Sequence, residues 1–132
     1  KLEMIRAIRA EFGIVPVKRG NVVVAWKSAR EKGGPGLWTP YAGAVEVRAL
    51  FRFERTLSCA AGSIGQVIPS HDVPWPIADD FGDLDKLCRN LGDALQQSGL
   101  IAEDRNIVSW VARKTWATGI ERAGVEFEVS QA

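Results

Sequence analysis

The chain has 132 residues and a formal net charge of +1 at pH 7, and 46% of its residues are hydrophobic and 25% charged, which is the composition of a globular domain that can bury a substantial core. No run approaches the roughly 18 apolar residues of a membrane span, and the opening KLEMIRAIRAEF lacks the long apolar segment of a secretory signal, so we expect a cytoplasmic protein without a membrane partner. The two cysteines and single histidine favour buried thiols over a disulfide or a zinc site.

The first predicted element is a helix over residues 2–12, because apolar side chains recur at helical spacing and Gly13 provides a stop. These apolar residues are Met4, Ile5, Ile8 and Phe12. The next stretch, IVPVKRGNVVVAWKSAREKGGPG, allows two interpretations. Residues 19–21, Arg-Gly-Asn, are typical of a turn between two strands, whereas Val22, Trp26 and Ala29 would share one face of a helix. We favour a strand followed by a helix.

The strongest strand signal covers residues 45–53, after a Gly/Pro-rich breaker at residues 32–36. Its apolar residues alternate with charged ones, which predicts a half-buried strand. The apolar set is Val45, Val47, Ala49, Phe51 and Phe53. Residues 58–81 are rich in Gly, Pro, Ser and Asp, so we expect a long mobile loop near a functional site there.

The second half of the chain begins with an amphipathic helix, for which Asp83 suits the N-cap and Gly99 the C-terminal stop. Its apolar face comprises Leu84, Leu87, Cys88, Leu91, Ala94 and Leu95. The run IVSWVARK, residues 107–114, and the alternating residues 125–129 predict two more strands. Together these elements predict an α+β fold: a single domain over residues 1–132 with a mixed β-sheet packed against helices.

Carboxylates gather around this second helix, whereas the first half of the chain is basic. Residues 1–60 carry 11 Lys and Arg against 5 Asp and Glu, and residues 61–132 carry 6 against 11. A metal-dependent nuclease needs both a basic surface for a polyanion and carboxylates for a divalent cation. An evenly solvated surface accounts for the same counts, and charge alone favours that simpler interpretation. Individual residues also have simpler interpretations. Asp83 is explained by a role as N-cap, and Asp85 with Arg89 by an i,i+4 ion pair.

A composite motif adds a more specific indication. The run DLDKLCRNLGDAL at residues 83–95 is followed by a short turn, by EDRNIV at residues 103–108, and by Lys114 on the next predicted strand. This arrangement resembles the RusA-like Holliday junction resolvases, whose pattern is D-L-D-N-L-x-K-x-x-x-D-A-L followed by D-D-x-x-V-V. The similarity covers residues 82–114 and preserves the spacing between the acidic groups. It implies a RusA-like fold.

The resemblance implies a metal site made by the carboxylates of Asp83, Asp85 and Asp104, which would hold Mg²⁺ or, in its place, Mn²⁺. Bound Mg²⁺ supplies what phosphodiester cleavage needs, namely a hydroxide near neutral pH and stabilisation of negative charge. Arg89 stands where the family has a lysine important for activity. Arginine keeps the charge and binds phosphate bidentately but does not donate a proton as lysine can. We therefore expect Arg89 to complete the catalytic set by stabilising charge.

Basic and aromatic side chains provide the predicted DNA contacts. Lysine and arginine contribute affinity for phosphates without reading sequence, and exposed tryptophans can stack on unpaired bases. The predicted phosphate-binding residues are Lys86, Arg89, Lys114, Lys18 and Arg19, and the stacking candidates are Trp38 and Trp75.

The resemblance implies a homodimeric, Mg²⁺-dependent endodeoxyribonuclease that resolves four-way junctions in DNA recombination and repair, in the cytoplasm of a bacterium or of a phage-infected host. Two-fold symmetry suits paired symmetrical nicks, because two identical sites can act on symmetrically related strands. Two alternatives stay open. One is a nuclease for flaps, forks and other branched DNA, and the other is a junction-binding protein without cleavage activity, which arginine at position 89 would accommodate.

Overall fold

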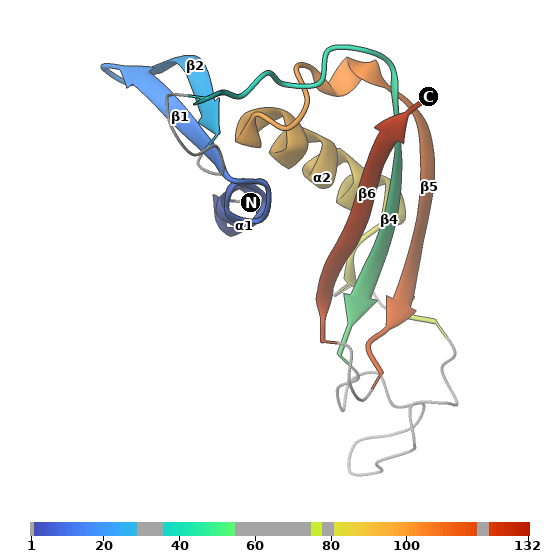
Figure 1. Ribbon diagram of the computed structural model, residues 1–132. Helices are drawn as coiled ribbons and strands as arrows, with labels where there is room; N and C mark the ends of the chain where they lie inside the picture. The colour runs from blue at the N-terminus through green and yellow to red at the C-terminus, as the bar shows by residue number, and fades with distance from the viewer. Residues whose placement is uncertain (1, 29–35, 55–74, 78–80, 119–121) are drawn as a thin grey trace. The chain divides into compact units, whose positions relative to one another are not determined.

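The computed structural model describes residues 2–28, 36–54, 75–77, 81–118 and 122–132. The elements within these ranges are α1 (Leu2–Phe12), β1 (Ile14–Arg19), β2 (Val22–Ser28), β3 (Gly36–Leu37), β4 (Val45–Phe53), α2 (Leu84–Ser98), the 3₁₀ helix η4 (Asp104–Asn106), β5 (Ile107–Trp116) and β6 (Gly124–Gln131). Figure 1 labels all of them except β3 and η4. The chain divides into two compact units. The first unit comprises Lys1–Val45, Arg89–Val108 and Gln131–Ala132, and the second comprises Glu46–Cys88 and Ser109–Ser130.

In the first unit, α1 packs against β1. Ile5 and Ile8 are buried and lie three positions apart, so they fall on one face of the helix. Gly13 follows the helix with φ +68°, a conformation that glycine adopts without strain and that commonly ends a helix. The predicted helix over residues 2–12 is confirmed.

The first unit also contains a β-hairpin, which corrects the sequence-based expectation of a helix from residue 22. β1 and β2 pair antiparallel from Ile14 with Ser28 to Arg19 with Val22, with a register shift between Val17 and Lys18. The helical spacing of Val22 and Trp26 was misleading, because a run of β-branched valines packs well on a pleated surface. The turn that favoured the other interpretation is present, with Gly20 at φ +65°.

In the second unit, β4 is the central strand of a three-stranded sheet with the order β5-β4-β6. β4 and β5 run in the same direction and β6 runs in the opposite one, so the sheet is mixed (Figure 1). The predicted alternation along β4 is confirmed, since Val47, Ala49 and Phe51 are buried whereas Arg48 is exposed. One face of β4 therefore lies in the core.

α2 begins and ends where the sequence predicts. Asp83 precedes its first residue and Gly99, at φ +89°, follows its last. Leu91 and Leu95 of its apolar face are fully buried. The predicted strands at residues 107–114 and 125–129 are present as β5 and β6. The fold class is α+β, as expected.

Most of the predicted loop at residues 58–81 lies outside the described residues, which include only residues 75–77 and 81 of it. Its mobility therefore stays a prediction. Over the ranges that are described, no helix combines the length and the apolarity needed to cross a membrane.

Candidate functional site

The start of α2 carries two of the predicted metal ligands, Asp83 and Asp85. Gly82 turns the chain into the helix with φ +74°. The carbonyl of Asp83 accepts the first helical hydrogen bond from the N–H of Leu87 at 3.0 Å. This is the backbone role of an N-cap residue, as the simpler interpretation of Asp83 expected. It leaves the carboxylate of Asp83 directed to solvent, with its side chain 70% exposed.

Side chains of β4 and β5 in the second unit hold the segment that leads into α2. The Phe81 ring lies 4.9 Å from that of Phe53 and 5.3 Å, edge to face, from that of Trp116, measured between centroids. The Nζ of Lys114 donates a hydrogen bond to the carbonyl oxygen of Gly82 at 2.9 Å. These contacts fix the segment from which Asp83 projects, so its carboxylate is presented by a supported turn.

Lys114 was predicted to contact DNA, but its ammonium group is half-buried and bonded within the protein. It lies two residues before the buried Trp116 on β5, and alternate residues of a strand share a face. The period-two pattern was therefore the signal that Lys114 points inward. Neither this role nor that of Phe81 was recognised from the sequence.

Lys86 lies in the first turn of α2, and its Nζ is 3.7 Å from Oδ2 of Asp83. Both side chains are about two-thirds exposed, and ion pairs of this kind contribute about 0–1 kcal/mol. This weak pair leaves Asp83 available to a cation and Lys86 available to a phosphate.

Asp85 and Arg89 are both exposed on α2 and lie four residues apart, which is about 6 Å along the helix axis. Burial raises the pKa of the Cys88 thiol, and the negative charge of Asp85 raises it further. The i,i+4 ion pair between Asp85 and Arg89, which was the simpler interpretation of these residues, is not formed, and in the described part of the chain no carboxylate pairs with Arg89. Its guanidinium group is therefore free to bind an anion.

Asp104, the third predicted ligand, begins η4 in the first unit. Its backbone N–H donates to Oε1 of Gln96 at 2.8 Å, and its side chain is exposed. The neighbouring Glu103 accepts a hydrogen bond of 2.6 Å from Nε of Arg105. Among the residues that the structure describes, no group of three or more His, Cys, Asp or Glu is placed to hold a metal ion. The grouping of Asp104 with Asp83 and Asp85, which belong to the second unit, stays a prediction.

The remaining predicted DNA contacts lie on other elements. Lys18 and Arg19 are exposed at the end of β1. Trp38 is half-buried, and its Nε1 donates to the carbonyl of Gly99 at 2.7 Å, which indicates a structural role. Trp75 is 49% exposed, with the guanidinium carbon of Arg113 5.9 Å from its ring centroid. Of the two predicted stacking residues, Trp75 retains an accessible ring.

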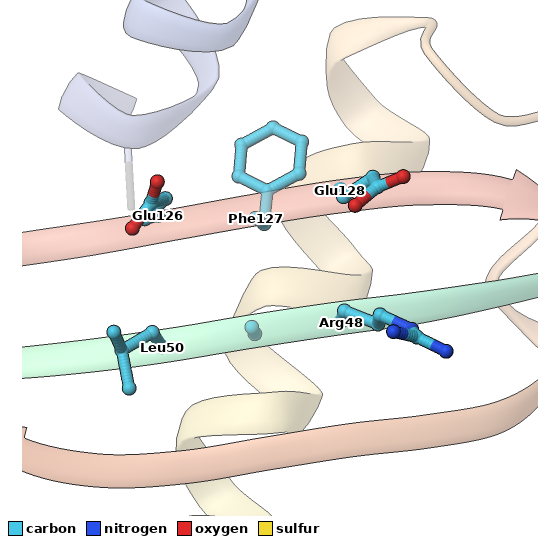
Figure 2. A pocket seen from close by; sticks show the side chains of 6 residues that line it. Arg48, Leu50, Glu126, Phe127 and Glu128 are labelled. Carbon is cyan, nitrogen blue, oxygen red and sulfur yellow. The ribbon is translucent and has the colours of Figure 1, made fainter.

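An open depression of about 340 Å³ lies on the sheet of the second unit (Figure 2). It is lined by residues of β4 and β6, namely Arg48, Ala49, Leu50, Glu126, Phe127 and Glu128. Its rim carries both signs of charge, and none of the predicted site residues lines it. We therefore place the candidate site at the start of α2.

No protein-family model, curated protein or solved structure matches the chain.

Proposed function

We propose that this chain is a divalent-metal-dependent endonuclease that acts on branched DNA, with its catalytic centre at the start of α2. The observation that carries the proposal is the pair of exposed aspartates, Asp83 at the N-cap and Asp85 in the first turn, of a helix whose start is held by Phe81 and Lys114. The resemblance of residues 82–114 to the RusA-like resolvases supplies the reaction class.

The donor chemistry at the helix start fits a hard divalent cation. Mg²⁺ is usually bound through one or two carboxylates, with waters and substrate phosphates completing its coordination. Asp83 and Asp85 offer such carboxylates, and the only ion pair at either of them in the described residues is the weak one with Lys86. The resemblance adds Asp104 as a further ligand.

In this proposal each residue has a separate task. Asp83 and Asp85 hold the cation, and bound Mg²⁺ would supply both a hydroxide near neutral pH and compensation for the charge that develops on phosphate. Arg89 binds a phosphate oxygen through its guanidinium fork and stabilises that charge. Lys114 and Phe81 are positioning residues, because they act through the backbone of Gly82.

We propose a four-way junction as the preferred substrate and a homodimer as the active form, since two identical sites can nick symmetrically related strands. Arg89 supports one second candidate, a junction-binding protein that does not cleave. Arginine stays protonated under all ordinary conditions, so it cannot protonate the leaving oxygen as the family lysine could.

The test is cleavage of a labelled mobile four-way junction with Mg²⁺, with Mn²⁺ or with EDTA, beside a flap, a fork and a linear duplex. The key variant is Asp85→Asn, which keeps the size of the side chain and removes its charge. Glu128→Gln is the matched control, since it removes one exposed carboxylate from β6. Loss of outer-shell partners of a metal costs about 10- to 100-fold, so we expect losing a direct ligand to lower the rate at least about 100-fold.

Circular dichroism and sedimentation of both variants check the fold and the dimer. The proposal fails if folded, dimeric Asp85→Asn nicks junctions at the native rate. Tight junction binding without nicks would establish the second candidate, a preference for flaps or forks would reassign the substrate, and indiscriminate cutting of duplex would indicate a general nuclease.

A further inference from the structure

The β1–β2 hairpin of the first unit is packed at its base and uncovered at its tip. At the base, the Trp26 ring lies against Gly99, and the guanidinium carbon of Arg9 is 5.3 Å from the ring centroid. Nearer the turn the register shifts between Val17 and Lys18 and passes over Val24, so the regular alternation of faces along β2 is interrupted there. Val22 and Val24 are 65% and 57% exposed. The tip of the hairpin therefore carries two uncovered apolar side chains.

Two cations stand at the same tip. The register pairs Arg19 with Val22 and Lys18 with Val23, directly beside the turn at Gly20. Lys18 and Arg19 are exposed, and no carboxylate in the described ranges forms an ion pair with either. The sequence from residue 12 to residue 30 contains four Lys and Arg and no Asp or Glu. A surface that concentrates positive charge without neutralising it is complementary to a polyanion.

The exposed valines favour branched DNA over intact duplex as the polyanion. Intact duplex offers phosphates but keeps its bases stacked, whereas a branch point exposes base faces. Proteins that bind distorted DNA often place apolar side chains against unstacked bases beside basic residues that hold the backbone. A tip with two cations and two valines has both parts of this arrangement.

We propose that the hairpin tip, formed by Lys18, Arg19, Val22 and Val24, is a DNA-contact surface that shares no residue with the metal site and recognises the branch point. Lys18 and Arg19 bind backbone phosphates, and the valines contact the bases that the branch exposes. This inference rests on the proposed function for its choice of DNA as the ligand. It makes the hairpin a determinant of affinity and of junction preference, without a part in cleavage.

The experiment measures binding of a fluorescent four-way junction and of a linear duplex with the same sequence, in EDTA, by anisotropy from 50 to 200 mM salt. Lys18→Gln with Arg19→Gln removes the cations. Val22→Thr with Val24→Thr adds polarity but keeps β-branched side chains that favour a strand. Arg6→Gln with Arg122→Gln is the matched control, because it removes two other exposed cations.

Each phosphate contact contributes about 0.9 to the slope of log K against log salt. We therefore expect the Lys18/Arg19 variant to lose about 2 from this slope, so that its affinity falls about tenfold less than that of the native chain across the salt range. The control pair should keep the native slope. The valine variant should also keep it but lose severalfold in preference for the junction over the duplex.

Any of three results would overturn the inference. The Lys18/Arg19 variant could keep the native salt slope, the control could lose as much slope as that variant, or the native chain could fail to bind DNA. An unchanged junction preference in the valine variant would remove the base-contact half of it. The result is independent of cleavage. Junction binding that depends on the hairpin, without metal-dependent nicking, would refute the proposed function alone, whereas nicking with hairpin-independent binding would refute this inference alone.

Discussion

Replacement of Gly99 by alanine is a direct test of how the first unit is packed. Gly99 follows α2 with φ +89°, and a Cβ built on it would lie 2.6–2.7 Å from three atoms of the Trp26 ring. The ring is held in place, because Arg9 stacks on it and donates hydrogen bonds to the carbonyls of Gln97 and Ser98 at the end of the helix. The clash is therefore with a rigid group that has little freedom to move.

The expected loss of stability has two parts. A positive φ costs a residue with a Cβ about 1–2 kcal/mol, and forcing a methyl group into a packed site costs about 1–3 kcal/mol. Gly99→Ala should therefore lower the free energy of unfolding by about 2–5 kcal/mol. Gly20→Ala is the matched control, since Gly20 has φ +65° but no atom within 4 Å of its Cβ position. It should show only the backbone part, about 1–2 kcal/mol.

The assay is urea unfolding followed by tryptophan fluorescence and by far-UV circular dichroism, with the midpoints compared at equal m values. The reduced entropy of the unfolded chain on replacing glycine by alanine is common to both variants and cancels in the difference. The difference between them isolates the contact with Trp26. If Gly99→Ala destabilises the protein no more than Gly20→Ala does, the packing of Trp26 against Gly99 is refuted.

Three further predictions concern the second unit. Lys114→Met removes the hydrogen bond to Gly82 and should lower the free energy of unfolding by about 1 kcal/mol, less than is usual for a charged donor because the group is partly exposed. An unchanged urea midpoint would contradict this. The pKa of Cys88 is raised first by burial and then by the charge of Asp85. In a Cys59→Ser background, Cys88 should therefore react with iodoacetamide at pH 8 more slowly than a cysteine peptide does, and Asp85→Asn should speed the reaction. Hydrogen bonds from Arg48 and Ser109 lower the pKa of Glu46. The stability that Glu46 contributes is therefore present above the ordinary glutamate pKa of about 4.3 and is lost as the pH falls through the lowered pKa. Glu46→Gln should flatten the dependence of unfolding free energy on pH below about pH 4, and a pH dependence identical to that of the native chain would count against this prediction.

Local patterns were sufficient for several elements. α1, β4 and α2 appear where the periodicity places them, and Gly13 and Gly99 end the helices as expected. These elements were predictable because their residues repeat with the period of the face they bury, which is a property of neighbours in the sequence. The residues from 22 to 28 were mispredicted, because β-branched side chains at helical spacing satisfy both patterns, and only pairing with β1 across the turn decides between them.

The sequence by itself determined the α+β class, the start of α2, and the presence of Asp83 and Asp85 at that start. The tertiary structure decided what surrounds them. It brings Lys114 of β5 to the carbonyl of Gly82 and Phe81 to the rings of Phe53 and Trp116, and it leaves the valines of the hairpin tip uncovered. These contacts join residues that are distant in the chain, so they depend on how the elements pack, which no local pattern of charge or hydrophobicity specifies.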